Sequence, residues 1–319
     1  MKNSYSNIFP LNKKTLNKTL GLLTKGSLIA LPTETVYGLA GNAYSSDAIK
    51  KIFKLKGRPK LNPLIIHYYN IQKAFDDVVI NSNFKKLYKK LCPGPITFIL
   101  KKKENSKVQS LANARMKTVA VRFPKHKVVR KILKDINFPL GMPSANISSG
   151  VSPVCAQDVF DEFRKKIKFI IDGGRSKIGI ESTVIDLTNT PKILRPGIIT
   201  SSQIEKILKL KLKKNFNKLK IKSPGMLKRH YSPGLPMTIN QKKTDNKSAF
   251  IYLGSKFKKK NNFFSLSKNS NLSEAASNLY KTFRLIKKKG FKKIQIAKIP
   301  SKSYGVAIND RIKRAASKK

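Results

Sequence analysis

Short apolar runs alternate with amphipathic segments through residues 1–210, and this alternation restricts the possible folds more than any other feature of the sequence. The apolar runs are rich in β-branched residues, as is typical of strands; they read SLIAL, LIIHYY, ITFIL, VAVRF, FIID, TVIDL and KILR. Between them, segments such as SSDAIKKIFKLKG and NSNFKKLYKKLC have the apolar spacing of helices that pack against a core. Interleaved strands and helices predict an α/β domain with a twisted mixed sheet, which we place at residues 1–210.

A second, smaller α/β unit is expected after a change in composition. Periodicity weakens after residue 210, and the segment KSPGMLKRHYSPGLPM contains three prolines and two glycines, as is typical of a linker. We predict a linker at 211–246 and a small Rossmann-like α/β domain at 247–319. Its long helix is expected to have Ser273 as N-cap and Gly290 as C-cap.

The chain is strongly basic, with 68 Lys and Arg against 16 Asp and Glu and a net charge of +52. Such a field attracts polyanions such as tRNA, nucleotides and pyrophosphate. Lys, Asn and Ile are abundant together, as in proteins from AT-rich genomes, so a solvated lysine coat is a second explanation of the charge. For the C-terminal third, the sequence leaves both explanations open.

No stretch approaches the ~18 consecutive apolar residues of a membrane span, and we expect no signal peptide before the first element. The two cysteines, Cys92 and Cys155, lie far apart and form no CxxC pattern. This spacing argues against a zinc site or a disulfide framework. We therefore predict a cytoplasmic protein without membrane association and without metal ligands of its own.

Three polar loops each adjoin an apolar run. They read LPTETVYGLAG, GMPSANISSGVSP and GGRSKIGIESTVID, and they are rich in hydroxyl groups and small residues. Ligands of α/β proteins usually bind where such loops meet at a sheet end. The three loops therefore predict one cleft, although ordinary surface loops have a similar composition.

A fourth segment, FKLKGRPKLNPLIIH, concentrates cations at a turn between a helix and a strand. Lys54, Lys56, Arg58 and Lys60 lie around a glycine and a proline, and such an arrangement can hold a triphosphate, with Arg58 supplying a fork of donors. The alternative is a solvated loop in a lysine-rich protein.

Two polar residues lie inside apolar strands. Arg122 in VAVRF requires an anion, supplied by the protein or by a ligand, because an unpaired buried charge is unfavourable. His67 in LIIHYY is more typical of a satisfied core residue than of a catalyst.

Taken together and in order, these segments resemble the threonylcarbamoyl-AMP synthases, or YrdC-like proteins. The matching blocks are LPTETVYGLAG, KLKGRPKLNPLIIH, CPGPITFIL, TVAVRFP, PSANISSGVSP, GIESTVIDL and ILRPG. They span about residues 10–200. In addition, SPGMLKRHYSP and GVAINDRIKRAA resemble the linker and the last helix of the two-domain form of the family.

The resemblance implies synthesis of L-threonylcarbamoyladenylate from L-threonine, bicarbonate or CO2, and ATP, with release of pyrophosphate. Partner proteins of the family then transfer the threonylcarbamoyl group to tRNAs that read ANN codons. By the same resemblance, the L-threonine ligands are Thr35, His67, Arg122, Met142 and Ser182. The ATP ligands are Arg58, Asn62, Thr118, Ser144, Asn146, Ser152, Arg195 and Tyr231. Lys56 and Arg58 are expected to neutralise the phosphates, together with a Mg²⁺ ion bound with ATP.

This chemistry needs no protein nucleophile, and we expect Glu34 to brace its loop rather than to bind metal. The linker is expected to close over ATP as a lid. One alternative is a tRNA- or double-stranded-RNA-binding protein without catalysis, whose binding would depend steeply on salt. Another is the related carbamoyltransferase of hydrogenase maturation, which requires zinc-finger modules that two scattered cysteines do not form.

Overall fold

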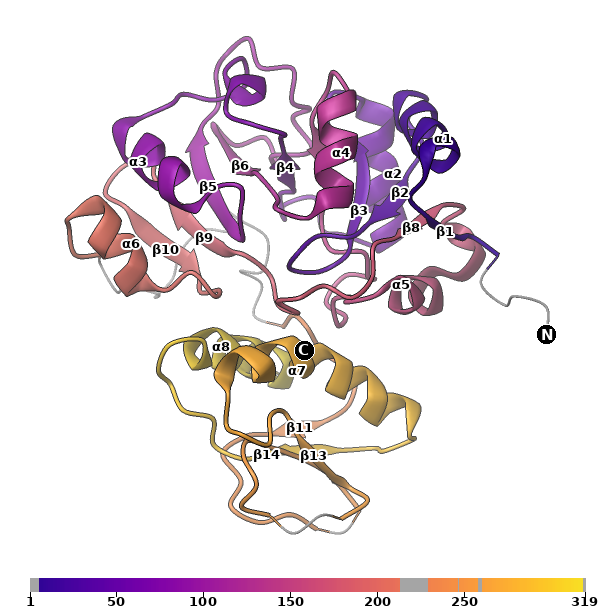
Figure 1. Cartoon of the computed structure of the whole chain (residues 1–319), viewed down its shortest axis with the longest axis vertical. Helices are drawn as coiled ribbons and strands as arrows, with labels where there is room; N and C mark the ends of the chain where they lie inside the picture. The colour runs from indigo at the N-terminus through magenta and orange to yellow at the C-terminus, as the bar shows by residue number, and fades with distance from the viewer. Residues whose placement is uncertain (1–5, 213–228, 246, 258–259, 318–319) are drawn as a thin grey trace.

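The computed structural model describes residues 6–212, 229–245, 247–257 and 260–317. Two separate sheets organise these residues (Figure 1). The large sheet has ten strands in the order β1-β8-β2-β3-β7-β4-β6-β5-β9-β10. Their bounds are β1 Ile8–Pro10, β2 Ile29–Leu31, β3 Gly38–Asn42, β4 Ile65–His67, β5 Ile96–Lys101, β6 Thr118–Arg122, β7 Leu140–Gly141, β8 Ile170–Asp172, β9 Thr183–Asp186 and β10 Lys192–Arg195.

The large sheet is mixed, which confirms the predicted fold class. Strand β8 is parallel to β1 and β2, β4 is parallel to β6, and β5 is parallel to β9. The remaining neighbours are antiparallel. Because β4 and β6 run in the same direction, their last residues, His67 and Arg122, lie opposite each other at one edge of the sheet.

Helices cover both faces of this sheet. Their bounds are α1 Lys13–Thr24, α2 Ser46–Lys56, α3 Ser82–Leu91, α4 Lys127–Asp135, α5 Ala156–Phe163 and α6 Ser201–Leu208, with short 3-10 helices η1 Gln72–Ala74 and η2 Arg164–Lys166. Helices α2, α3, α5 and α6 share one apolar cluster with Ile66 of β4, Phe98 of β5 and Val121 of β6. Helices α1 and α4 pack against Ile29 and Leu31 of β2 on the other face.

The part of this second face over β4, β5, β6 and β9 is where the site forms. Successive strand residues point to opposite faces, so Ile65 and His67 point away from Ile66 and the larger cluster. A small cluster on this side contains Ile65, Ile99, Ala120, Val184 and Leu194, all of them strand residues. Within the described residues, no helix contributes to it, and polar side chains therefore have room beside it.

The small sheet is parallel throughout and has the order β11-β14-β12-β13. Its strands are β11 Met237–Thr238, β12 Ala249–Tyr252, β13 Phe263–Ser265 and β14 Ile294–Ile296, and its helices are α7 Leu272–Lys288 and α8 Gly305–Ala316. Both helices share an apolar cluster with Ile251 and Ile294. In Figure 1 they lie between the small sheet and the large domain.

Two details of this region differ from the sequence-based expectation or refine it. Strand β11 lies inside the segment predicted as linker and pairs with β14, so that part of 211–246 belongs to the small sheet. Helix α7 begins after Asn271, whose side chain accepts from the amides of Ser273 and Glu274. The predicted N-cap, Ser273, was therefore wrong, because the side-chain oxygen of Asn271 already satisfies these amides.

None of the helices that the structure describes combines the length and the apolar character needed to cross a membrane. Residues 213–228, which include SPGMLK of the predicted lid, lie outside the described residues.

Candidate active site

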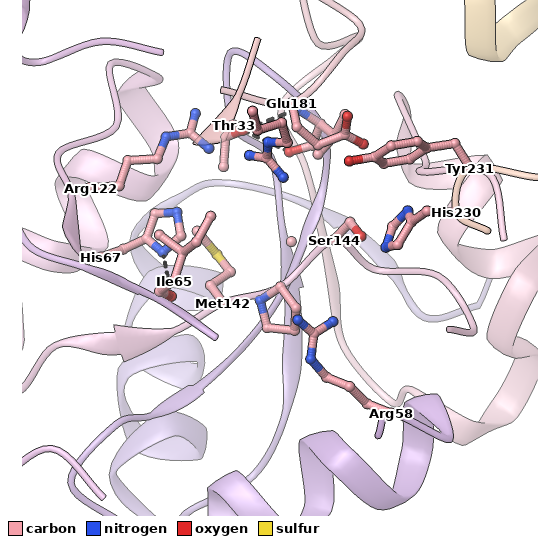
Figure 2. A pocket seen from close by; sticks show the side chains of 14 residues that line it. Thr33, Arg58, Ile65, His67, Arg122, Met142, Ser144, Glu181, His230 and Tyr231 are labelled. Atoms are coloured by element: carbon pink, nitrogen blue, oxygen red, sulfur yellow. Dashed lines mark hydrogen bonds between the residues drawn. The ribbon is translucent and has the colours of Figure 1, made fainter. Parts of the chain in front are cut away.

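A cavity of about 490 Å³, including its open mouth, lies on the uncovered part of the large sheet (Figure 2). Seven of the predicted ligand residues line it: Arg58, His67, Arg122, Met142, Ser144, Arg195 and Tyr231. The other lining residues are Thr33, Val36, Gly38, Ile65, Pro143, Glu181 and His230. The predicted cleft is thus built from the polar loops, the ends of β4, β6 and β10, and the described part of the linker.

Arg122 forms one end of the cavity. Its Nη2 donates to Glu34 Oε1 and to Thr35 Oγ1, both at 2.8 Å. Glu34 Oε2 also accepts from the backbone amide of Lys125 at 3.0 Å. Burial alone would raise the pKa of Glu34, but Arg122 and these hydrogen bonds hold it below its usual value. Glu34 therefore braces the loop, as expected, and supplies the anion that Arg122 requires.

Arg122 nevertheless retains donor capacity. Its Nε is buried and has no hydrogen-bond partner among the described residues. Such a group is unfavourable unless something else accepts its proton. A ligand carboxylate at this end of the cavity would satisfy it.

His67 lies beside Arg122 in the paired strands and is buried. Its Nδ1 is 3.1 Å from the carbonyl oxygen of Ile65, which can only accept, so Nδ1 carries the proton. Burial, and then the charge of Arg122, hold the pKa of His67 well below its usual value. The ring is therefore neutral at pH 7 and lines the cavity without adding charge. His67 is thus a buried residue with a hydrogen-bond partner, as in a core, and it also lines the cavity, as a ligand residue would.

Arg58 and Arg195 bring positive charge to the rest of the cavity. Arg58 donates from Nε to the carbonyl oxygen of Asn62 and from Nη2 to Asn62 Oδ1, both at 2.8 Å. Burial, with a further contribution from Arg195, lowers the pKa of Arg58 to about 9. A buried cation destabilised in this way gains most from an anionic ligand. Figure 2 shows Arg58, His230 and Tyr231 at the end of the cavity opposite His67 and Arg122.

The cationic turn separates into two classes of residue. Lys54 and Lys60 are exposed, whereas Lys56 and Arg58 are buried. Lys56 does not line the cavity. Its ammonium donates to the carbonyl oxygens of Ser144, at 2.6 Å, and of Asn146. In this structure Lys56 therefore holds the GMPSANISSGVSP loop in place behind Ser144.

The remaining predicted residues lie around the cavity rather than in its wall. Thr35 and Asn62 orient the two arginines through the contacts above. Ser182 accepts from Arg195 Nη2 at 3.0 Å, and Ser152 donates to Glu181 at 2.6 Å. Asn146 donates its side-chain amide to the backbone of its own loop.

Thr118 is placed differently from the others. It is the first residue of β6, paired with Lys101, whereas Arg122 is the last. Four residue steps along the strand separate the two Cα atoms by about 13 Å. The structure does not bring Thr118 to the cavity wall, and its part in ATP binding stays a prediction from the resemblance.

The linker closes one side of the cavity with His230 and Tyr231. Both are buried, and Tyr231 has a φ of 63°. Burial, with Arg58, Lys56 and Arg195 nearby, lowers the pKa of His230 to about 3, so its ring is neutral. Within the described chain, the hydroxyl of Tyr231 and Nδ1 of His230 have no hydrogen-bond partner.

Sequence reasoning assigned no ligand role to Thr33, Glu181 or His230, although each lies in a segment that it singled out. Thr33 lies two residues before Thr35, Glu181 precedes Ser182, and His230 precedes Tyr231. The position of Glu181 depends on contacts with the small domain, which local sequence does not reveal.

The chemistry open to this site is binding and charge stabilisation rather than nucleophilic attack. Neither Cys92 nor Cys155 lines the cavity, and burial raises the pKa of their thiols to about 12 and about 11. Among the described residues, no group of three or more His, Cys, Asp or Glu side chains is arranged to hold a metal ion. The two carboxylates nearest the cavity, Glu34 and Glu181, are both paired with arginines.

Comparisons with known proteins agree with this geometry over both domains. A family profile described as "Telomere recombination" matches residues 21–197, and one described as "Threonylcarbamoyl-AMP synthase, C-terminal domain" matches residues 199–317. The chain is 35% identical to the threonylcarbamoyl-AMP synthase of Pyrococcus abyssi, over 93% of this chain and 92% of that protein. It is 38% identical to the threonylcarbamoyl-AMP synthase of Bacillus subtilis, over 72% of this chain and 67% of that protein.

A solved structure extends the likeness to three dimensions. The crystal structure of P. abyssi Sua5 complexed with L-threonine superposes with a TM-score of 0.86 at 33% identity, covering 97% of this chain and 96% of that one. Sequence and structure thus match from the first domain through the second. The chain belongs to the two-domain form of the YrdC-like family of threonylcarbamoyl-AMP synthases.

Proposed function

We propose that this protein condenses L-threonine, bicarbonate or CO2, and ATP into L-threonylcarbamoyladenylate and releases pyrophosphate. The observation that carries the proposal is that Arg58, Arg122 and Arg195 open into one cavity. Arg122 and Arg58 lie at its opposite ends (Figure 2). An amino-acid carboxylate and a polyphosphate can therefore bind side by side. Relatives that share both domains are named threonylcarbamoyl-AMP synthases, and one was crystallised with L-threonine.

The Arg122 end fits a small amino acid. The unpartnered Nε of Arg122 would donate to the substrate carboxylate, and the neutral ring of His67 adds no competing charge. Met142 and Ile65 supply apolar surface at this end (Figure 2), where the methyl group of threonine would pack. Gly38 allows Met142 to pack against the loop backbone, because a Cβ there would lie 2.4 Å from Met142 Cγ.

The Arg58 end fits ATP. Arg58 and Arg195 would pair with phosphate oxygens, and anion binding would offset the destabilisation of the Arg58 cation by burial and by Arg195. Ser144, whose loop Lys56 holds in place, adds a hydroxyl to the wall. Tyr231 and His230 would cover the nucleotide and exclude water.

The reaction then follows from placement. The amine of threonine and CO2 form a carbamate, one oxygen of which forms a bond to the α-phosphorus as the bond to pyrophosphate breaks. Holding the reactants in line can contribute about 7–11 kcal/mol to the barrier reduction. The arginines stabilise charge on the phosphates. Mg²⁺ would be held by phosphate oxygens and water rather than by a protein carboxylate cluster, and it would supply further charge neutralisation.

The tRNA-related role is part of the same proposal. The product would be handed to the proteins that transfer the threonylcarbamoyl group to tRNAs reading ANN codons, in the cytoplasm. Noncatalytic binding of tRNA or double-stranded RNA is the second candidate, favoured only by the net charge of +52. A relative that matches this chain over both domains carries the synthase name, which favours the synthase over the hydrogenase-maturation carbamoyltransferase.

The decisive assay supplies purified protein with ATP, Mg²⁺, bicarbonate and each amino acid in turn, and measures pyrophosphate and a new adenylate. Pyrophosphate release that depends on L-threonine and bicarbonate is the expected result. Arg58→Ala should abolish it, whereas Lys60→Ala, a cation two residues away but exposed, should retain it. Salt-dependent RNA binding without threonine-dependent turnover would support the RNA-binding alternative instead.

A further inference from the structure

Arg311 of α8 is the most deeply buried cation of the small domain, and it contacts three different segments of the active site. Its side chain is fully buried. Its Nε donates to Glu181 Oε2 at 2.8 Å, and its Nη1 donates to the carbonyl oxygen of Pro196 at 2.8 Å. Its guanidinium carbon lies 5.1 Å from the ring centroid of Tyr231. None of the described residues that line the cavity belongs to the small domain.

The first of these contacts resolves an electrostatic conflict. Glu181 lines a cavity that we propose for two anionic substrates, where an unpaired carboxylate would repel a triphosphate. Ser152 and Tyr280 donate to this carboxylate at 2.6 and 2.9 Å, but both are neutral. Arg311 forms a salt bridge to Glu181 with a fully buried guanidinium. The small domain thus supplies the cation that is bonded to this carboxylate. The same guanidinium also pairs with Asp310, and Arg195 adds positive charge near Glu181.

The other two contacts set the geometry of neighbouring ligand residues. Pro196 follows Arg195, so the bond from Arg311 fixes the backbone from which a predicted phosphate ligand extends. Tyr231 lies against both Arg311 and Tyr280, whose ring centroid is 5.8 Å away with an interplanar angle of 27°. The two side chains from α8 and α7 therefore hold the linker tyrosine in its buried position.

We propose that Arg311 is a positioning residue of the adenylate-forming site: it neutralises Glu181 and clamps Tyr231, so that the small domain completes the ATP end of the cavity. The proposal rests on the proposed function and extends it to a residue about 130 positions from Glu181 in the chain. It also gives a physical reason for the second domain, because no other described cation bonds to the side chain of Glu181.

The test compares Arg311→Met, Glu181→Gln and the double variant with the parent chain, measuring kcat and KM for ATP at saturating L-threonine. Arg311→Met should lower kcat/KM for ATP by 100-fold or more, because it leaves Glu181 unpaired beside the phosphates. The double variant should recover to within tenfold of Glu181→Gln, since the uncompensated charge is gone. Arg311→Lys should fall between, because lysine keeps the charge but not the three contacts.

Arg284→Met is the matched control. Arg284 also bridges the domains, through the carbonyl oxygen of Val151 and the carboxylate of Glu162, but it does not line the cavity. Its variant should keep kcat/KM within about threefold. Equal losses in Arg284→Met and Arg311→Met would show that domain docking alone is being measured and would overturn the proposal.

Two further results would also overturn it: activity of Arg311→Met within twofold of the parent chain, or a double variant no better than Arg311→Met. If the parent chain releases no pyrophosphate with any amino acid, the proposed reaction fails separately. Calorimetry with ATP then tests Arg311 alone. ATP affinities that rank the variants in the order predicted above for kcat/KM support the role of Arg311. Equal ATP affinities in all variants contradict it.

Discussion

Replacing Glu34 by alanine should destabilise the large domain and leave Arg122 without its protein anion. The pair is almost fully buried, with side-chain exposures of 5% for Arg122 and 10% for Glu34, and its atoms are 2.8 Å apart. Removing one member of such a pair typically costs about 3–5 kcal/mol, because the other charge stays buried and unpaired. The amide of Lys125 also loses its acceptor.

This loss converts into a large thermal shift. For a domain of this size, 1 kcal/mol corresponds to about 2–4 °C in Tm, so the variant should unfold about 6–20 °C below the parent chain. Saturating L-threonine should raise the Tm of Glu34→Ala more than that of the parent chain, because the substrate carboxylate replaces the missing anion.

Differential scanning calorimetry, with and without L-threonine, measures both effects. Glu104→Ala is the control, because Glu104 is an exposed carboxylate on the same domain and its removal should change stability by no more than about 0.5 kcal/mol. A Tm for Glu34→Ala within 2 °C of that for Glu104→Ala would refute the reasoning.

Three further predictions test other parts of the site. First, Arg311 and Arg195 overcome the effect of burial and lower the pKa of Glu181 from 4.5 to about 2. Because this pKa is lower in the folded than in the unfolded state, the ionised carboxylate stabilises the folded protein above pH 4.5. About 3 kcal/mol of this stabilisation should be lost as the pH falls from 4.5 toward 2. Urea midpoints between pH 6 and 2 should show this fall in the parent chain and less of it in Glu181→Gln. Second, Gly179→Ala should separate the domains and lower turnover, because φ is +76° and the new Cβ would lie 2.6 Å from Ser277 Cα. Gly174→Ala is the control, because this glycine has a φ of +75° but open space around the new Cβ. Equal turnover in both variants would count against the contact between Gly179 and Ser277. Third, Lys56→Met should cost about 1–3 kcal/mol by leaving two loop carbonyls unpaired, whereas Lys54→Met, which is exposed, should be neutral in urea unfolding; equal effects would contradict the bracing role.

Local sequence was sufficient to predict most strands and helices of the large domain, because the spacing of apolar residues in each segment matches the element that the segment forms. The run ITFIL predicts β5, and the buried spacing of Ile49, Ile52 and Phe53 predicts α2. Exact strand order was not predictable, since β8 inserts between β1 and β2 through contacts across more than 130 residues. The short β11 was missed because two residues carry no periodicity.

The site was predictable to the extent that its residues lie in the motif loops. Arg58, His67 and Arg122 reach one cavity, as the resemblance implied. In the lysine-rich turn, Lys56 and Arg58 are buried, whereas Lys54 and Lys60 are exposed. This difference depends on tertiary packing and could not be predicted from the number of charges in the segment. The Glu181–Arg311 pair depends on domain docking and has no local signal.

A crystal structure with L-threonine and a non-hydrolysable ATP analogue tests the central claim most directly. We predict the threonine carboxylate within hydrogen-bonding distance of Arg122, and the phosphates against Arg58 and Arg195, in the same cavity under Tyr231. Threonine and nucleotide bound on separate surfaces, or a nucleotide that leaves Arg58 and Arg195 without contact, would contradict the account.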